Sequence, residues 1–155
     1  MRALLQRVTH AEVRVGGEVI GSTGRGLVVL LGVGRGDDEP VADALAQRVA
    51  ELRIFPDEHG RTNLSVLDVG GGALVVSQFT LYADTRRGRR PGFTYAAPPD
   101  LAGRLYERFC RRLGAAGVAV GRGRFGASMQ VALVNDGPFT IWLDTDEGAV
   151  PPAAG

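Results

Sequence analysis

Lysine is missing from this chain of 155 residues, and all 18 of its cationic side chains are arginine. Every cation is therefore a planar fork suited to carboxylates and phosphates. Only one cysteine is present, Cys110, so no intramolecular disulfide can form and a reducing cytoplasm is the expected setting. Long apolar runs are also missing: the strongest, Leu27–Leu31, is far shorter than the roughly 20 residues of a membrane span. Because Arg7 interrupts any signal-peptide core, we expect no membrane partner.

A strong net charge is absent as well, because 18 basic residues are balanced by 17 acidic ones. With 45% hydrophobic and 23% charged residues, the composition excludes a disordered chain, which needs fewer apolar residues and more net charge. A chain of this length forms one ordinary domain. No repeat or shift of composition marks a second one, so we expect a single domain over residues 1–146 and a flexible tail over 147–155.

Hydrophobic periodicity predicts a chain of mixed strands and helices. Strands are expected at Arg2–Val8, Ala11–Val15, Glu18–Ile20, Gly26–Val33, Ala73–Phe79, Met129–Val134 and Phe139–Asp144. The valine and leucine run of Gly26–Val33 is typical of a central strand that is buried on both faces. Helices are expected from about Pro40 to Arg53 and from near Asp100 to Gly114, each with one apolar face.

Metal and dinucleotide sites are both rejected. His10, His59 and Cys110 are scattered without the paired spacing of metal ligands. Cys110 follows Phe109 on the second predicted helix, where a packing role is the simpler interpretation. Gly121–Gly126 matches the pattern G-x-G-x-x-G, but it runs into a predicted strand, whereas a dinucleotide motif opens a helix.

Polar residues close an otherwise apolar strand at Ser77–Thr80. Buried polar groups need hydrogen-bond partners, and ligands in α/β folds tend to bind at strand ends. A hydroxyl nucleophile normally needs an adjacent base, and the sequence places neither His10 nor His59 beside Thr80. Taken alone, this segment is explained more simply as a strand end whose polar groups are satisfied.

A basic segment, Arg86–Arg90, is followed by Phe93 and Tyr95 and so places four guanidinium groups beside aromatic rings. Such a patch can hold phosphates and stack a base. A solvated basic loop explains it equally well, and the segment by itself does not decide between the two.

Two well-separated segments, Ser77–Leu81 and Asn135–Thr140, together resemble the signature of the D-aminoacyl-tRNA deacylases, also called D-tyrosyl-tRNA deacylases. The resemblance extends in the same order over nearly the whole chain, through Gln6–Val8, Leu52–Phe55, Ala83–Arg86, Gly123–Ala127, Met129 and Val131. The chain departs from the family pattern at Phe139, where a smaller aliphatic residue is common, and at Gly92, where serine is usual. The tail beyond about Asp146 also runs past the usual family end.

The resemblance implies a homodimeric, cytoplasmic enzyme with its active sites at the subunit interface. Its implied reaction is hydrolysis of the ester between a D-amino acid and the terminal ribose of tRNA, a proofreading of chirality in translation that also covers mischarged glycyl-tRNA. The implied fold is mixed α/β, a single domain with β-sheets packed face to face and two main helices on the outside. Neither a metal nor an organic cofactor is implied.

The resemblance assigns the catalytic role to Ser77, Gln78, Phe79 and Thr80. An aminoacyl ester is already activated, so positioning and an oxyanion site made by backbone N–H groups around Phe79 and Thr80 are enough in principle. Two routes of attack stay open. Because no base stands beside Thr80, we favour an attack that relies on a hydroxyl of the tRNA ribose over an attack by Thr80 itself.

Chiral selection is implied for the Gly137–Pro138 peptide, which is expected to be cis and to reach the active site of the partner subunit. Its two carbonyl oxygens would then exclude the side chain of the L-isomer. Arg7, Met129 and Asn135 are implied to support this motif. Phosphate contacts at the acceptor end of tRNA are assigned to Arg86, Arg87, Arg89 and Arg90.

Two other classes of function stay open. One is a hydrolase of small D-aminoacyl esters or peptides that uses Thr80 as nucleophile and needs no RNA. The other is a tRNA-binding module without catalysis. Comparing a charged tRNA with a minimal D-amino acid ester as substrates distinguishes the first class from a tRNA deacylase. A single deacylation assay distinguishes the second class from any enzyme.

Overall fold

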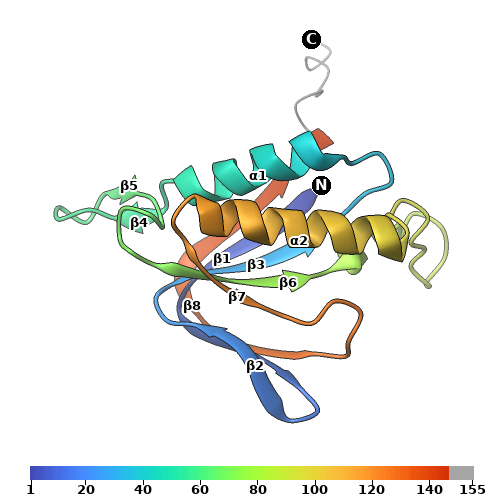
Figure 1. The fold of residues 1–155 in the computed structure, drawn as a ribbon, viewed down its shortest axis with the longest axis horizontal. Helices are drawn as coiled ribbons and strands as arrows, with labels where there is room; N and C mark the ends of the chain where they lie inside the picture. Colours follow the sequence, from blue (N-terminus) through green and yellow to red (C-terminus); the bar gives the residue numbers. More distant parts are fainter. Residues whose placement is uncertain (147–155) are drawn as a thin grey trace.

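The computed structural model describes residues 1–146, which form a curled sheet with two helices against one face (Figure 1). Six strands make up the sheet, and a two-stranded hairpin lies beside it. The predicted tail, residues 147–155, lies outside the described residues. In chain order the elements are β1 (Arg2–Val15), β2 (Glu18–Thr23), β3 (Gly26–Gly32), α1 (Glu39–Glu51), β4 (Phe55–Pro56), β5 (Thr62–Leu64), β6 (Gly72–Ser77), the 3-10 helix η1 (Phe79–Tyr82), α2 (Pro99–Ala115), β7 (Ala119–Arg122) and β8 (Gln130–Asp144).

Strand β1 organises the sheet because it pairs along both of its edges. One edge pairs with β3 over its first half and with β2 over its second half, and the other edge pairs with β8 along nearly its whole length. All of these pairs are antiparallel, whereas β3, β6 and β7 run parallel to one another. Parallel strands are usually covered on both faces, and the predicted two-sided burial of β3 is confirmed by Leu27, Val28 and Val29.

The sheet curls until β2 lies against β7, and two glycines permit this approach. A Cβ atom at Gly21 would collide with the carbonyl oxygen of Arg122, and one at Gly121 would collide with that of Ser22. A second apolar cluster fills the inside of the curl. It consists of Val8, Ala11, Val13, Val28, Leu74 and Val76. The expected mixed α/β class with sheet packed on sheet is thus confirmed, with the facing layers supplied by one curled sheet.

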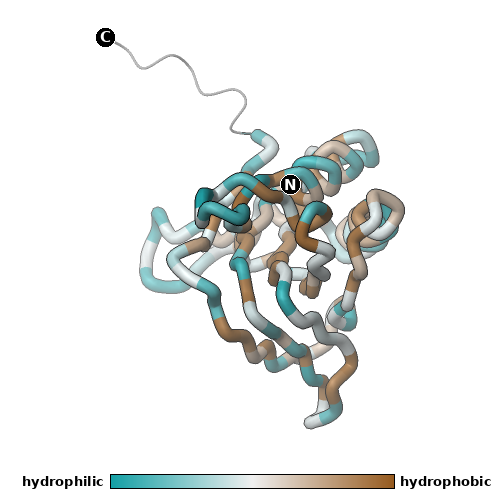
Figure 2. Tube along the Cα trace, turned by 90° about the vertical axis from the view of Figure 1, so that its left-hand side faces the viewer, coloured by the Kyte–Doolittle hydropathy of each residue, from teal (hydrophilic) through white to brown (hydrophobic). Residues whose placement is uncertain are grey.

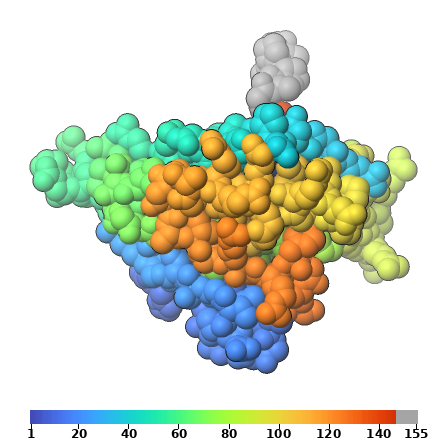
Figure 3. All heavy atoms as spheres, viewed as in Figure 1, coloured from blue at the N-terminus to red at the C-terminus, as the bar shows by residue number. Residues whose placement is uncertain are grey.

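Helices α1 and α2 cover the opposite face of the sheet, as predicted (Figures 1 and 3). Helix α1 begins where the Asp38 side chain accepts a hydrogen bond from the Val41 N–H, at 3.1 Å. Arg108 of α2 joins the helices through ion pairs with Asp43 at 2.7 Å and with Glu39 at 2.5 Å. The main core lies between helices and sheet, and its largest members include Leu45, Phe55, Leu105, Tyr106, Phe109 and Leu113. Cys110 is buried there, which confirms its packing role.

The strand boundaries differ from the prediction at both ends of the chain. The two strands expected within residues 2–15 are one continuous strand, and so are the two expected within 129–144. Register shifts in the β1–β8 pairing, between Gln6 and His10, absorb the turn-forming residues Asn135–Pro138 inside β8. Proline is tolerated there because β8 pairs only with β1 and so leaves one edge of the sheet free.

Two further elements correct the prediction. Strand β6 ends at Ser77, and the chain then turns through η1, so Phe79 does not belong to the strand. Gly121–Gly126 spans the end of the unpredicted strand β7 and a loop that opens no helix, so its rejection as a dinucleotide motif is confirmed. Apolar segments run through the strands, while hydrophilic segments gather in the outer loops (Figure 2). Over residues 1–146, neither helix has the length and apolar character needed to cross a membrane.

Candidate active site

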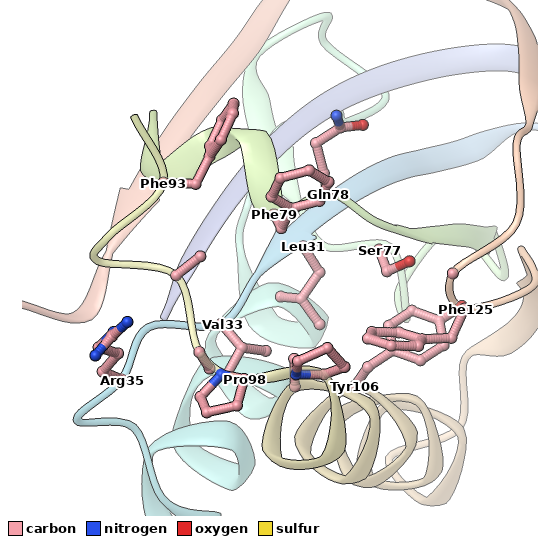
Figure 4. Close-up of a pocket in the computed structure, with 15 residues that line it drawn as sticks. Leu31, Val33, Arg35, Ser77, Gln78, Phe79, Phe93, Pro98, Tyr106 and Phe125 are labelled. Carbon is pink, nitrogen blue, oxygen red and sulfur yellow. The ribbon is translucent and has the colours of Figure 1, made fainter. Parts of the chain in front are cut away.

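A pocket of about 500 Å³ opens where β3 and β6 end and α2 begins (Figure 4). We call it the site pocket. Its wall is mostly apolar, which is typical of small-molecule sites, and is formed by Leu31, Val33, Arg35, Ser77, Gln78, Phe79, Phe93, Ala96, Ala97, Pro98, Pro99, Ala102, Tyr106, Phe125 and Gly126.

Three of the four predicted catalytic residues line the site pocket: Ser77, Gln78 and Phe79. The Gln78 N–H donates to the Leu31 carbonyl at 2.8 Å, which carries the β3–β6 pairing one residue beyond β6. Phe79 is 57% exposed at the mouth and packs edge-on against Phe93, with 4.9 Å between ring centroids. The first signature segment therefore forms one wall of a real cavity.

Thr80 differs from its neighbours because it does not belong to the pocket lining. Its hydroxyl oxygen accepts a hydrogen bond from the side-chain amide of Gln78. An amide is not a base at neutral pH, so this contact orients the hydroxyl without activating it. Over residues 1–146, no histidine or carboxylate is hydrogen-bonded to the Thr80 hydroxyl.

The turn after β6 leaves backbone donors free. The first N–H groups of a 3-10 helix have no acceptor within the helix. In the described chain, the N–H groups of Phe79 and Thr80 donate to no other protein group, whereas those of Leu81 and Ala83 donate to the carbonyls of Gln78 and Thr80. Two adjacent free donors beside an apolar pocket are suited to an oxygen that gains negative charge.

The floor of the site pocket comes from α2 and from the loop after β7. The Tyr106 hydroxyl donates to the Val75 carbonyl at 2.8 Å, and the Tyr106 ring lies 6.1 Å from that of Phe125. Sequence reasoning missed Arg35, Tyr106 and Phe125, because each is brought here from a distant part of the chain. Phe125 lies inside the rejected glycine motif. An aromatic residue among glycines was the one sequence signal that could have pointed to this position.

Arg7 contacts the second signature segment through Asp136 and Phe139. Arg7 is only 7% exposed, and its guanidinium donates to the Ile54 carbonyl at 2.6 Å and to the Asp136 carbonyl at 3.2 Å. It also pairs with the Asp136 carboxylate at 2.9 Å and lies 4.3 Å from the centre of the Phe139 ring. A planar cation is thus fixed against the residues on both sides of Gly137–Pro138.

The peptide bond between Gly137 and Pro138 is cis. The Asn135 side-chain amide donates to the carbonyls of Arg7 and Phe139, at 2.9 and 3.1 Å, and so closes the loop around this bond. Met129 lies elsewhere, at the end of the loop after β7, where its sulfur accepts a hydrogen bond from the Arg124 N–H at 3.3 Å.

The two signature segments do not meet within one chain. Ser77 pairs with Leu31, at the level of Ala3 on β1, whereas Asn135 pairs with Val8. Ser77 and Asn135 are therefore separated by about 16 Å along the strands and by three strand spacings of about 4.8 Å each across the sheet.

The basic segment projects at one edge of the molecule, beyond the start of α2 (Figure 3). Arg86 is not a free cation, because it binds both oxygens of the Asp84 carboxylate at 2.8 Å and donates to the Tyr95 hydroxyl at 3.0 Å. The guanidinium holds the pKa of Asp84 down to about 2. Arg87, Arg89 and Arg90 are exposed and carry no salt bridge in the described chain.

Burial raises the pKa of the Cys110 thiol to about 11, so this side chain stays neutral at physiological pH. Within residues 1–146, no three His, Cys, Asp or Glu side chains gather in a group able to hold a metal ion.

Taken together, fold and site define a mixed α/β protein with an apolar pocket and two free backbone donors at the carboxyl ends of parallel strands. Residues 4–144 match the family model described as D-Tyr-tRNA(Tyr) deacylase. The chain belongs to this family of enzymes.

Curated relatives carry the name of this family, and solved structures share the fold. A protein of Roseiflexus castenholzii named D-aminoacyl-tRNA deacylase is 64% identical over 94% of this chain and 92% of its own length. One of the same name from Ruegeria pomeroyi is 62% identical, over 93% of this chain and 99% of its own. Among solved structures, the c-Myc DNA unwinding element binding protein is 40% identical, with a TM-score of 0.89 over 94% of this chain and 99% of its own. A probable eukaryotic D-amino acid tRNA deacylase, 18% identical, shares the fold with a TM-score of 0.81 over 92% of this chain and 97% of its own.

Proposed function

We propose that this enzyme hydrolyses the ester bond of D-aminoacyl-tRNA and so removes D-amino acids from tRNA in the cytoplasm. The observation that carries the proposal is the Ser77–Thr80 segment in a chain of this family. Its first three residues line a mostly apolar pocket, and the N–H groups of Phe79 and Thr80 are free donors beside it. The relatives named D-aminoacyl-tRNA deacylase support the substrate class.

The ester carbonyl would lie against Ser77–Thr80, with its oxygen directed at the N–H groups of Phe79 and Thr80. These donors stabilise the negative charge that develops when water attacks the carbonyl carbon. A neighbouring hydroxyl of the tRNA ribose assists the water, because Thr80 is bonded to an amide and has no base within reach. The new bond joins the water oxygen to the carbonyl carbon, the ester bond to the ribose oxygen breaks, and that oxygen takes up a proton and leaves as the tRNA hydroxyl. The chain contributes position and electrostatics, which suffice for an ester that is already activated.

Rejection of L-amino acids is proposed for the backbone of Gly137–Pro138 in a homodimer. Because this peptide lies far from Ser77 in its own chain, it would serve the site pocket of the partner subunit. The carbonyl oxygens of Gly137 and Pro138, in a segment whose flanking residues Asp136 and Phe139 are bound by Arg7 and Asn135, would clash with an L side chain and leave room for a D side chain. Glycine has no side chain to reject, so mischarged glycyl-tRNA would also be a substrate.

The acceptor end of tRNA would cross the edge that carries the basic segment. Arg87, Arg89 and Arg90 are exposed cations that suit phosphates. Arg86 is committed to Asp84 and is better suited to holding the loop in shape.

A deacylation time course on matched D- and L-aminoacyl-tRNA tests the activity. We expect release of the D-amino acid, with the L-ester decaying at its uncatalysed rate. Equal decay of both esters with and without protein would contradict the proposal and leave a non-catalytic tRNA-binding module. Turnover of a minimal D-amino acid ester as fast as that of the charged tRNA would favour the RNA-independent hydrolase.

Mixing two damaged subunits tests the partner arrangement. Ala102→Phe fills the site pocket, and Gly137→Val adds methyl groups at the peptide where a Cβ meets only the Asn135 side-chain oxygen, at 3.4 Å. After subunit exchange, half of the dimers carry one intact site, so the mixture should regain about a quarter of full activity. If each site is built within one chain, no activity returns.

A further inference from the structure

Arg35 lies at one end of the site pocket, directly beyond β3 and across the pocket from Ser77 and Phe125 (Figure 4). It also lines an adjoining cavity of about 270 Å³, which we call the side cleft. The two cavities therefore meet at this side chain. The side cleft is formed by Arg2, Gly34, Arg35, Gly36, Asp37, Tyr82, Tyr95 and Asp146.

The backbone beneath Arg35 is fixed from both sides. Its N–H donates to the Tyr95 carbonyl at 3.2 Å, next to an antiparallel bridge between Gly34 and Ala96. On the other side, a Cβ atom at Gly34 would come within 2.7 Å of the Tyr82 hydroxyl, so only glycine fits against this ring. The side chain of Arg35 is exposed above this rigid support.

The acidic residues nearest to Arg35 in the chain are engaged elsewhere. Asp37 pairs with the ammonium of Met1 at 2.6 Å and accepts the Gly34 N–H, while Asp38 caps α1. Arg35 forms no salt bridge within residues 1–146, unlike Arg86, which is neutralised by Asp84. Arg35 thus adds an uncompensated cation to the rim of a mostly apolar pocket, and among residues 1–146 it is the only arginine that lines that pocket.

We propose, building on the proposed function, that Arg35 binds the phosphate that precedes the terminal nucleoside of tRNA. A pocket of about 500 Å³ accommodates an aminoacyl-nucleoside, a ligand of the size that such cavities hold. With the ester at Ser77–Thr80, the phosphate leaves the pocket at its other end, where Arg35 offers a bidentate fork. The Asp146 carboxylate in the side cleft repels phosphate, which keeps the phosphate on the pocket side of Arg35.

Tyr95 completes this subsite as a stacking platform for the base of the nucleotide before the terminal one. Its ring is 53% exposed, and its hydroxyl is held by the Arg86 guanidinium at 3.0 Å. Aromatic rings beside cations are the usual means of binding single-stranded nucleic acid without strict sequence preference. The subsite therefore recognises an RNA 3′ end by charge and stacking.

Binding of uncharged tRNA at several salt concentrations tests the phosphate contact. One lost single-strand contact removes about 0.7 from the slope of log affinity against log salt, so Arg35→Ala should weaken binding about eightfold at 50 mM salt and about threefold at 200 mM. Arg48→Ala is the matched control, since Arg48 is an exposed arginine of α1 without a salt bridge in the described chain. An unchanged affinity, or a loss that does not depend on salt, would overturn the contact.

Tyr95→Ala should weaken binding about fivefold or more with an unchanged salt slope, and Tyr95→Phe should bind like the unchanged protein. If Tyr95→Ala binds normally, the stacking half of the subsite is wrong.

A truncated substrate separates this subsite from the pocket itself. Arg35→Ala should raise KM for D-aminoacyl-tRNA and leave kcat/KM for a D-aminoacyl-nucleoside without a 5′-phosphate unchanged within about twofold. Equal losses on both substrates would mean that Arg35 acts on the aminoacyl-nucleoside itself and not on the phosphate, and would overturn the proposal. If the wild-type protein deacylates no D-aminoacyl-tRNA, the proposed function is refuted. The measurement of tRNA binding at several salt concentrations would still decide the role of Arg35.

Discussion

The segments Ser77–Leu81 and Asn135–Thr140 are equally distinctive in sequence, but the chain builds them in different ways. The first lies at the end of a buried parallel strand and forms one wall of a pocket. The second lies in a strand with a free edge, where side chains of Arg7 and Asn135 fix its backbone. A binding site needs a cavity, whereas a segment that excludes ligands needs only a rigid shape. The comparison teaches that one chain holds a pocket and, apart from it, a segment whose backbone is fixed by two side chains.

The largest effect is expected on the free energy of unfolding when Arg7, which contacts the second segment, is replaced. Arg7→Ala leaves the Ile54 and Asp136 carbonyls without their buried donor and the Asp136 carboxylate without its cation, which should lower the free energy of unfolding by about 3 kcal/mol. Urea denaturation measures this. Arg14→Ala is the control on the same strand, because its pair with Glu12 is partly exposed and should contribute less than about 1 kcal/mol. Equal losses would mean that Arg7 has no special supporting role.

Filling the pocket should be almost as damaging to activity. Ala102 is buried at the start of α2 and lines the site pocket, so Ala102→Phe should lower kcat/KM for D-aminoacyl-tRNA about 100-fold by displacing the substrate. Ala115→Phe, at the exposed end of the same helix, should leave kcat/KM unchanged. Full activity of the first variant would show that the substrate does not occupy this pocket.

A smaller effect is expected at the basic segment. Replacing Arg89 and Arg90 together by glutamine should reduce the salt slope of tRNA binding by about 1.4 to 1.8, depending on whether the phosphates are single- or double-stranded. Arg86→Gln serves as comparison, because Asp84 already neutralises this cation and its loss should change the slope less. An unchanged slope in the double variant would make the segment a solvated loop.

The smallest effect is expected at Thr80. Thr80→Ala should keep kcat within about tenfold of the unchanged enzyme, because the hydroxyl is bonded to an amide and no base activates it. Single-turnover deacylation measures the chemical step directly. A loss of about 10⁴-fold with intact tRNA binding would restore Thr80 as the nucleophile and place the whole reaction in the first segment.

Local patterns in the sequence were enough to predict most elements of the fold. The central strand β3, both helices and the packing of Cys110 follow from the spacing of apolar residues and from helix caps, which act over a few neighbouring positions. The same patterns placed breaks inside β1 and β8 where none exist. Register shifts between the two strands accommodate those residues, and such shifts depend on a partner that is distant in the chain.

The sequence by itself determined the fold class, the family signature and the two segments that carry it. Only the tertiary structure decided which residues surround them. Arg35, Tyr106 and Phe125 reach the site pocket from three separate parts of the chain. Arg86 forms an ion pair with Asp84 and is not a free cation. The physical reason is range: helix and strand preferences are set by nearby residues, whereas a cavity or an ion pair exists only after strand register and helix packing bring distant residues together.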